Sequence, residues 1–147
     1  MSFVNENNTK YRSGKKYAEV ISKIKKEGIC PFCGDYMHKF HKKPILKTGK
    51  YWLLTDNAYP YEGAKHQLLL VHKKHIESVE DLSAPAWAEL RTLAKEIIKK
   101  RKIKGGSFLM RFGDTDYTGA SVAHLHANLV SPDGEDPNRK PIITRIA

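Results

Sequence analysis

The feature that most constrains the fold of this chain is the stretch of residues 119–130, in which polar and apolar residues alternate toward its end. Alternation with a period of two is typical of a β-strand that buries one face in a core. On such a strand His124, His126 and Asn128 share one face, and the apolar residues between them share the other. The stretch therefore predicts a strand that carries two imidazoles and an amide on one rigid surface.

A turn of small residues, Thr118 to Ser121, comes directly before this strand. Glycine and other small residues let backbone N–H groups approach an anion closely. A pair of histidines separated by one residue is a weak signal by itself, because solvated histidines on an edge strand give the same pattern. The turn beside the pair favours a phosphate-binding site over that alternative.

The chain has 147 residues, which is the size of a single domain with a substantial core. Its 40% hydrophobic and 29% charged residues are typical of globular proteins, and no apolar run is long enough for a transmembrane helix. The N-terminal residues lack the apolar core of a signal peptide. We therefore expect a cytoplasmic protein without a membrane partner.

The formal net charge is +10, and much of it lies in runs of basic residues such as 99–102. Long-range attraction favours anionic partners for such a chain, whether they are nucleotides or nucleic acid. Solvated faces of helices and loops also collect lysines. The charge therefore selects no partner on its own.

Hydrophobic periodicity predicts two helices. Residues 14–27 form an amphipathic helix that Gly28 ends, and a longer helix begins after Ser83 and runs to about Lys102. We expect the first helix to pack on the domain, with a docking surface for a partner as the alternative. The apolar stripe expected on the longer helix consists of Trp87, Leu90, Ala94, Ile97 and Ile98.

The remaining pattern predicts strands with short connections. The expected strands are residues 37–46, 51–55, 67–72, 107–112, 124–131 and 142–146, and residues 1–13 are expected to be loose. This order argues for an α+β fold with a mainly antiparallel sheet, one long helix and an extra N-terminal helix. We divide the chain into a tail with a helix, residues 1–29, and a main domain, residues 30–147.

The only two cysteines form a Cys-x-x-Cys motif, Cys30 and Cys33. In a cytoplasmic chain this spacing is typical of metal binding or of a redox pair, although the strand and helix order of a thioredoxin-like protein is missing around it. Tetrahedral zinc needs two more ligands, which histidines supply. The histidines are His38, His41, His66, His72, His75, His124 and His126, and spacing alone leaves the choice among them open.

The central strand and its turn resemble the motif of the histidine-triad (HIT) superfamily of nucleotide hydrolases and transferases, His-φ-His-φ-His-φ-φ after a Gly-x-Ser-Val turn. The residues that carry the resemblance are Gly119, Ser121, Val122, His124, His126, Leu129 and Val130. Asn128 stands in the place of the third histidine, where related transferase branches carry glutamine. The resemblance covers about residues 30–131 and implies a HIT-like domain, usually a homodimer, that binds a nucleotide with adenine as the expected base.

The resemblance to zinc-containing members implies the ligand set Cys30, Cys33, His75 and His124. His38 and His41 are the alternatives that lie nearest to the cysteines in sequence. Zinc with four protein ligands has no open position, so its role is expected to be structural. Iron fits the same donor set.

By position, His126 corresponds to the nucleophile of the family, which attacks the α-phosphorus of a nucleotide and releases a nucleoside monophosphate through a nucleotidyl-histidine intermediate. A neutral imidazole is a competent nucleophile near neutral pH. Ser121 and Asn128 are expected to hold phosphate oxygens by hydrogen bonds. Because an amide cannot give up a proton as histidine can, Asn128 predicts a slower enzyme or a narrower choice of leaving groups.

Five further residues are expected to bind substrate. Gly119 and Ala120 offer backbone N–H groups, and Arg111 offers positive charge, with a simple surface role as its alternative. The resemblance assigns Asp56 to the ribose hydroxyls and His66 to a histidine position at the start of the central strand. A turn residue and a surface histidine are the respective alternatives.

Other functions stay open on the sequence alone. Within the same family, the substrate is alternatively a diadenosine polyphosphate, or an AMP group on a nucleic-acid end, which needs the basic surface beside the site. A different class is a non-catalytic module that binds nucleotide or nucleic acid, in which Asn128 marks a decayed site.

Overall fold

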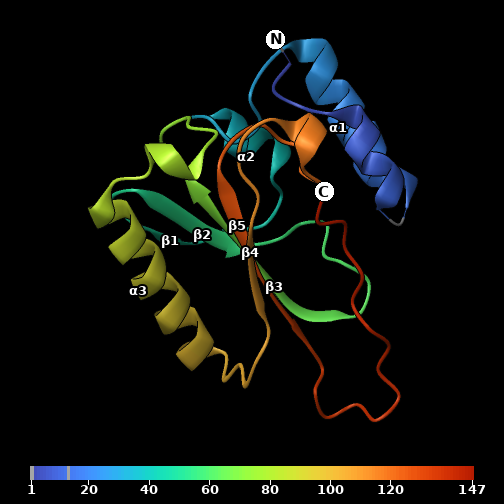
Figure 1. Ribbon diagram of the computed structural model, residues 1–147, viewed down its shortest axis with the longest axis vertical. Helices are drawn as coiled ribbons and strands as arrows, with labels where there is room; N and C mark the ends of the chain where they lie inside the picture. Colours follow the sequence, from blue (N-terminus) through green and yellow to red (C-terminus); the bar gives the residue numbers. More distant parts are fainter. Residues whose placement is uncertain (1, 13) are drawn as a thin grey trace.

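The computed structural model describes residues 2–12 and 14–147, and within them it forms one antiparallel sheet of five strands with helices on both faces (Figure 1). The strands are β1 (Ile45–Thr48), β2 (Trp52–Asp56), β3 (Ala64–His72), β4 (Ser107–Met110) and β5 (His126–Pro132), in the order β1-β2-β3-β5-β4. The helices are α1 (Lys15–Glu27), α2 (Tyr36–Phe40) and α3 (Ala84–Lys100), with 3-10 turns at Glu6–Tyr11, Val79–Asp81 and Thr115–Tyr117. The predicted α+β class is confirmed.

Helix α3 covers one face of the sheet because one of its faces is apolar. Its start is fixed by Ser83, whose hydroxyl accepts the N–H of Ala86 at 3.2 Å, and by Trp52, whose ring N–H donates to the carbonyl of Ala86 at 2.8 Å. The main core lies beneath the helix and contains Trp52, Leu54, Leu68, Leu70, Leu90, Leu93, Ile97, Leu125, Ala127 and Leu129.

Two predictions about α3 are wrong in detail. The buried stripe follows Ala86, Leu90, Leu93 and Ile97, and the spacing of these residues leaves Trp87 and Ile98 at the side, with 45% and 37% of their surfaces exposed. The helix also ends at Lys100 rather than near Lys102, because Lys102 takes a left-handed backbone conformation with φ 52°.

The opposite face of the sheet carries α2 and the N-terminal segment. Met37 of α2 packs on Leu69 and Val71 of β3. Ile21 and Ile24 of α1 pack in a separate cluster with Val4 and Val122. Figure 1 shows α1 and α3 on opposite sides of the sheet, so the first helix packs on the domain as expected.

The first residues are held more firmly than the sequence predicts. Val4 forms a β-bridge with Val122, and the side-chain amide of Asn8 donates to the carbonyls of Thr115, Thr118 and Ala120. The expectation of a loose tail is therefore wrong for residues 2–12. Residues 1 and 13 lie outside the described part of the chain.

The predicted strands differ from the observed ones in their bounds, and one of them does not form. Residues 37–46 contain helix α2, which ends at Phe40, and only Ile45 onward is extended, because Pro44 cannot continue a helix. The last strand of the sheet begins at His126 and not at His124. Residues 142–146 pair with no strand and instead contact the side chain of Arg111.

Among residues 2–12 and 14–147 there is no helix long and apolar enough to span a membrane. The division of the chain at residue 30 stays a prediction.

Candidate functional site

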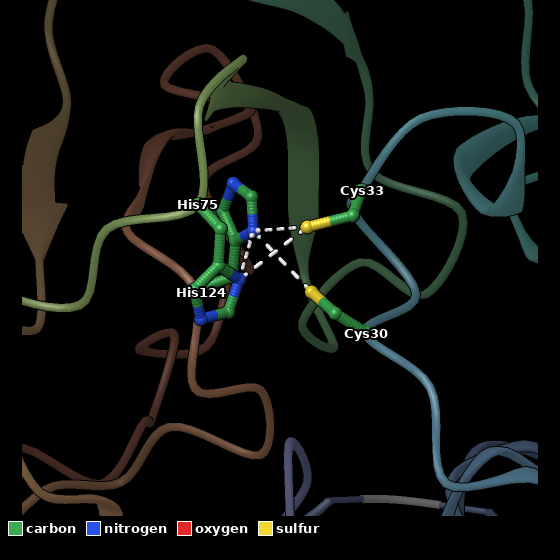
Figure 2. A group of neighbouring side chains, drawn as sticks. All are labelled: Cys30, Cys33, His75 and His124. Carbon is green, nitrogen blue, oxygen red and sulfur yellow. Dashed lines mark hydrogen bonds between the residues drawn. The ribbon is translucent and has the colours of Figure 1, made fainter.

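Four side chains from three parts of the chain point toward one another, close to where β3 ends and β5 begins (Figure 2). The Nδ1 atom of His124 lies 3.3 Å from the sulfur of Cys30 and 3.5 Å from that of Cys33. The Nδ1 atom of His75 lies 3.4 Å from the sulfur of Cys33 and 3.2 Å from Nδ1 of His124. All four atoms lie within 4.8 Å of one another.

These distances fit the corners of a tetrahedron around one metal ion. With metal–sulfur and metal–nitrogen bonds of about 2.3 and 2.05 Å, a tetrahedral site separates sulfur from nitrogen by about 3.5 Å and nitrogen from nitrogen by about 3.3 Å. The observed distances of 3.3–3.5 Å and 3.2 Å are close to both values. The four residues therefore form a cluster that can hold a metal ion.

The far side of each imidazole supports the same conclusion. The Nε2–H of His124 donates to the carbonyl of His72 at 2.6 Å, and the Nε2 of His75 lies 3.1 Å from a carboxylate oxygen of Glu77. Such partners leave Nδ1 as the unprotonated nitrogen, as metal-bound histidines require. The two rings are therefore oriented for ligation by groups outside the cluster.

Burial disfavours charge in this cluster. It raises the pKa of the Cys30 thiol to about 12 and lowers the pKa of His124 to about 4. A metal ion reverses the effect on the thiols, because it binds thiolates and neutral imidazoles. The alternatives for the ligand set lie elsewhere: His38 is exposed, and Nε2 of His41 is 2.7 Å from the Thr55 hydroxyl.

A cavity of about 100 Å³ lies on the sheet face opposite α3. Strand β5 contributes His126 and Asn128, and the preceding turn contributes Gly119 to Val122. The segment after β2, helix α1 and both terminal segments complete its walls. Its polar lining includes Asn57, Arg111, Ser121, His126 and Asn128, together with His41.

His126 is held as a neutral imidazole. Its Nδ1–H donates to the carbonyl of His124 at 2.6 Å, which leaves Nε2 as the nitrogen with the free electron pair. Burial lowers the pKa of His126, and the ring packs edge-on against Phe32 with centroids 5.2 Å apart. The cavity is thus lined by an unprotonated imidazole nitrogen, which is a potential nucleophile.

The turn before β5 is tightly packed. A Cβ atom on Gly119 would lie 2.8 Å from the carbonyl oxygen of Arg145 and 3.1 Å from Nε of Arg111, so only glycine fits. The N–H of Ala120 donates to the Thr118 hydroxyl at 3.1 Å, which removes it as an anion donor. Ser121 is buried and lines the cavity.

Arg111 brings positive charge to the cavity. Its terminal nitrogens donate to the Tyr61 hydroxyl at 3.3 Å, to the Thr144 hydroxyl at 3.1 Å and to the carbonyl of Arg145. Its Nε–H is buried and has no hydrogen-bond partner among the described residues. The guanidinium therefore keeps one donor that the described residues do not use.

Two of the expected substrate residues lie elsewhere. Asp56 accepts two hydrogen bonds, at 2.5 and 2.8 Å, from Arg101 just beyond α3, and the bonds lower the pKa of Asp56. Neither Asp56 nor His66 lines the cavity. The next residue along β3, Gln67, is the one whose side chain points to the site. Successive side chains of a strand point to opposite faces of the sheet, so His66 and Gln67 cannot both do so.

The fold and site place the chain in the HIT-like class. The family model described as "Scavenger mRNA decapping enzyme C-term binding" matches residues 29–142, and the chain belongs to this HIT-like family. No curated protein sequence matches the chain.

Solved structures agree on the fold. A hypothetical histidine triad nucleotide-binding protein from Sulfolobus tokodaii is 23% identical, with 80% of this chain and 79% of that chain covered and a TM-score of 0.57. A HIT family hydrolase from Clostridium thermocellum is 19% identical, with 74% and 95% covered and a TM-score of 0.57. Diadenosine triphosphate hydrolase from Plasmodium falciparum is 18% identical, with 63% of each chain covered and a TM-score of 0.51.

Proposed function

We propose that this protein is a nucleotide hydrolase or nucleotidyl transferase that uses His126 as its nucleophile. The observation that carries the proposal is the neutral imidazole of His126, with Nε2 unprotonated at the wall of a cavity that also holds Arg111 and Ser121. Hydrolases and nucleotide-binding proteins among the structural neighbours agree with it.

In the first step, Nε2 of His126 forms a bond to the α-phosphorus of a nucleotide, and the bond from that phosphorus to the leaving group breaks with its electron pair on the leaving group. In the second step, water attacks the same phosphorus and the phosphorus–nitrogen bond breaks. The nucleoside monophosphate leaves, one water proton passes to solvent, and the imidazole returns to its first state.

The developing charge on the phosphate is held by donors that are present before substrate enters. Ser121 lines the cavity with its hydroxyl, Asn128 with its amide and Arg111 with its guanidinium charge. Fixed donors of this kind stabilise the transition state in a site that excludes water.

We propose zinc for the cluster of Cys30, Cys33, His75 and His124. Two thiolates and two imidazoles are a common zinc donor set, and four protein ligands leave no position for substrate, so its role is structural. Zinc would fix the backbone carbonyl of His124, which orients His126. The free thiols of both cysteines suit a reducing compartment such as the cytoplasm.

A homodimer is the expected assembly. Trp87 and Ile98 of α3 and Phe108 of the edge strand β4 are exposed, and these residues line one apolar groove. An apolar surface of this kind on an edge strand and a helix suits a second copy of the same chain.

Intact-protein mass spectrometry tests the proposal after the zinc-loaded protein is mixed with diadenosine tetraphosphate. We expect a transient adenylyl adduct, which adds the mass of AMP less one water, and His126→Ala should lose the adduct and at least about 10³-fold in AMP release. His38→Ala is the matched control, because His38 is exposed and lies outside the cavity. Nucleotide binding without turnover in the unmodified protein would favour the binding module instead.

A further inference from the structure

Three side-chain amides meet beneath the cavity. The amides of Asn57, which follows β2, and of Gln67 in β3 each lie 3.0 Å from the same oxygen of Asn128 in β5. Gln67 and Asn128 are both buried. An amide group has one acceptor end and one donor end, so the network allows only certain orientations.

The main chain fixes these orientations. The backbone N–H of Tyr59 donates to the Asn57 side chain at 2.8 Å, and the backbone N–H of Tyr61 donates to the Gln67 side chain at 2.6 Å. Because an N–H group only donates, the atoms it reaches must be the amide oxygens. The NH₂ ends of Asn57 and Gln67 therefore face Asn128, and the atom of Asn128 that they share must be its oxygen.

The remaining end of Asn128 is then its NH₂ group. Asn128 lines the cavity beside His126, and its NH₂ group has no hydrogen-bond partner among the described residues. We propose that Gln67 and Asn57 are positioning residues that lock Asn128 as a donor to the cavity, so that the site takes nucleotides whose leaving group departs as a phosphate anion. The second half of this proposal rests on the proposed function of His126.

The kind of leaving group can be inferred because the Asn128 amide cannot supply a proton. An amide N–H stabilises negative charge on oxygen but releases no proton at neutral pH. A phosphate leaving group needs no proton, because it is stable as an anion near neutral pH. An amine must gain a proton as its bond to phosphorus breaks, and a positioned acid is what supplies it.

Among the described lining residues, no carboxylic acid and no second imidazole takes the place of that acid. The described lining of the cavity contains no aspartate or glutamate. His41 lines the cavity, but its Nε2–H is used by the Thr55 hydroxyl, which itself donates to the carbonyl of Pro44. Burial also lowers the pKa of His41, which disfavours its protonated form.

The first test compares substrates that share the AMP group. We measure single-turnover release of AMP from diadenosine tetraphosphate, from the p-nitrophenyl ester of AMP and from adenosine 5′-phosphoramidate. We expect the first two to react and the phosphoramidate to be at least about 10²-fold slower, which is the usual contribution of a missing general acid. Equal rates for the phosphoramidate and diadenosine tetraphosphate would overturn the leaving-group assignment.

The second test reads the amide network without any turnover. Gln67 is the only glutamine of the chain, so selective ¹⁵N labelling of glutamine side chains gives one NH₂ signal pair. We expect Asn128→Asp to move this pair strongly, because the acceptor becomes a carboxylate, while the melting temperature is retained. An unchanged signal would mean that Gln67 does not donate to Asn128 and would overturn the positioning role.

Variants of Gln67 connect the two tests. Gln67→Glu keeps an acceptor for the N–H of Tyr61 but loses the donor to Asn128, and Gln67→Met loses both. We expect both variants to lower kcat on diadenosine tetraphosphate by about 10-fold or more, with KM changed less than about threefold for Gln67→Met. Asn138→Met is the control for an exposed amide.

The outcomes separate the two proposals. No turnover in the unmodified protein with a shifted Gln67 signal in Asn128→Asp means that the proposed function fails and the amide network stands. Normal turnover in both Gln67 variants means that the network does not position Asn128 for the reaction. A loss confined to Gln67→Met means that Gln67 acts only by holding the Tyr61 loop.

Discussion

His124 and His126 lie two residues apart and serve two regions that differ in how their polar groups are paired. In the cluster with Cys30, Cys33 and His75, the four donor atoms point at one another, and partners outside the cluster fix both rings. In the cavity, His126 and Asn128 are each held by hydrogen bonds at one polar atom, and Nε2 of His126 and the NH₂ group of Asn128 are left without a partner among the described residues.

This difference teaches how one short segment serves two purposes. A polar group whose hydrogen-bonding atoms are all paired within the protein contributes to stability. A rigid polar group with one unpaired atom is available to bind a ligand. The carbonyl of His124 links the regions, because it accepts the Nδ1–H of His126. Substitution of a residue in the cluster should therefore also change the cavity, whereas substitution of a cavity residue should leave metal binding by the cluster unchanged.

The largest effect is expected from Cys33→Ser. Loss of this ligand should abolish stoichiometric metal binding and remove a cross-link between the Cys-x-x-Cys turn and the segment just before β5, at a cost of about 2–5 kcal/mol. For a chain of this size that lowers the melting temperature by about 5–20 °C. Metal analysis and thermal unfolding measure both effects.

His38→Ala is the matched control for this experiment, and it should keep both the metal and the melting temperature. His126→Ala should do the same, although it loses activity. If Cys33→Ser kept a full equivalent of metal, the cluster would not be the metal site and the contrast between the two regions would disappear.

The cluster could be predicted from sequence because cysteine and histidine are recognisable as metal ligands by residue type alone. Only two cysteines exist, and the resemblance to a known motif supplied His75 and His124. The long helices could also be predicted, since their periodicity extends over several turns. The short helix at residues 36–40 could not, because five residues are too few to show a helical period.

The cavity was harder to predict because its partners are ordinary polar residues. Whether His66 or Gln67 reaches the site depends on a register of one residue along β3, which no local pattern near its start reveals. Asp56 has the right position in the motif, but Arg101 is 45 residues away in sequence and occupies both of its oxygens. Pairings over such distances appear only in the folded chain.

An intermediate effect is expected from Asn128→His. The sequence alone predicts a gain in rate, because histidine can donate a proton. The structure presents two N–H donors, from Asn57 and Gln67, to the side chain at this position, and these donors oppose a positive charge. We therefore expect a gain on adenosine 5′-phosphoramidate well below the ~10²-fold that a positioned acid supplies.

The double variant Asn128→His with Gln67→Glu sharpens this test. A carboxylate at position 67 accepts a hydrogen bond from the imidazolium and stabilises its charge, so the gain should be larger than in the single variant. A full gain in the single variant, with none added by Gln67→Glu, would contradict the orientation deduced for the amides.

The smallest effect is expected on the other face of the sheet, at the ion pair of Asp56 with Arg101. Arg101 lowers the pKa of Asp56, so the pair contributes stability above the unfolded pKa of about 3.9 and loses it as the pH falls through the lower folded value. Both side chains are partly exposed, at 31% and 25%, which limits the contribution to about 0.5–1 kcal/mol. Asp56→Asn should lower the free energy of unfolding in urea at pH 7 by that amount.

Carbon-detected NMR titration of the Asp56 carboxyl measures the same coupling without unfolding, and its midpoint should rise in Arg101→Gln. The kinetics of Asp56→Asn decide between stability and substrate binding at this residue. Because Arg101 occupies both carboxylate oxygens, we expect KM for diadenosine tetraphosphate to change less than about threefold. A rise in KM of tenfold or more would mean that Asp56 leaves Arg101 to bind the ribose. Residues on both faces of the sheet would then bind the ligand, and the two regions would not be separate.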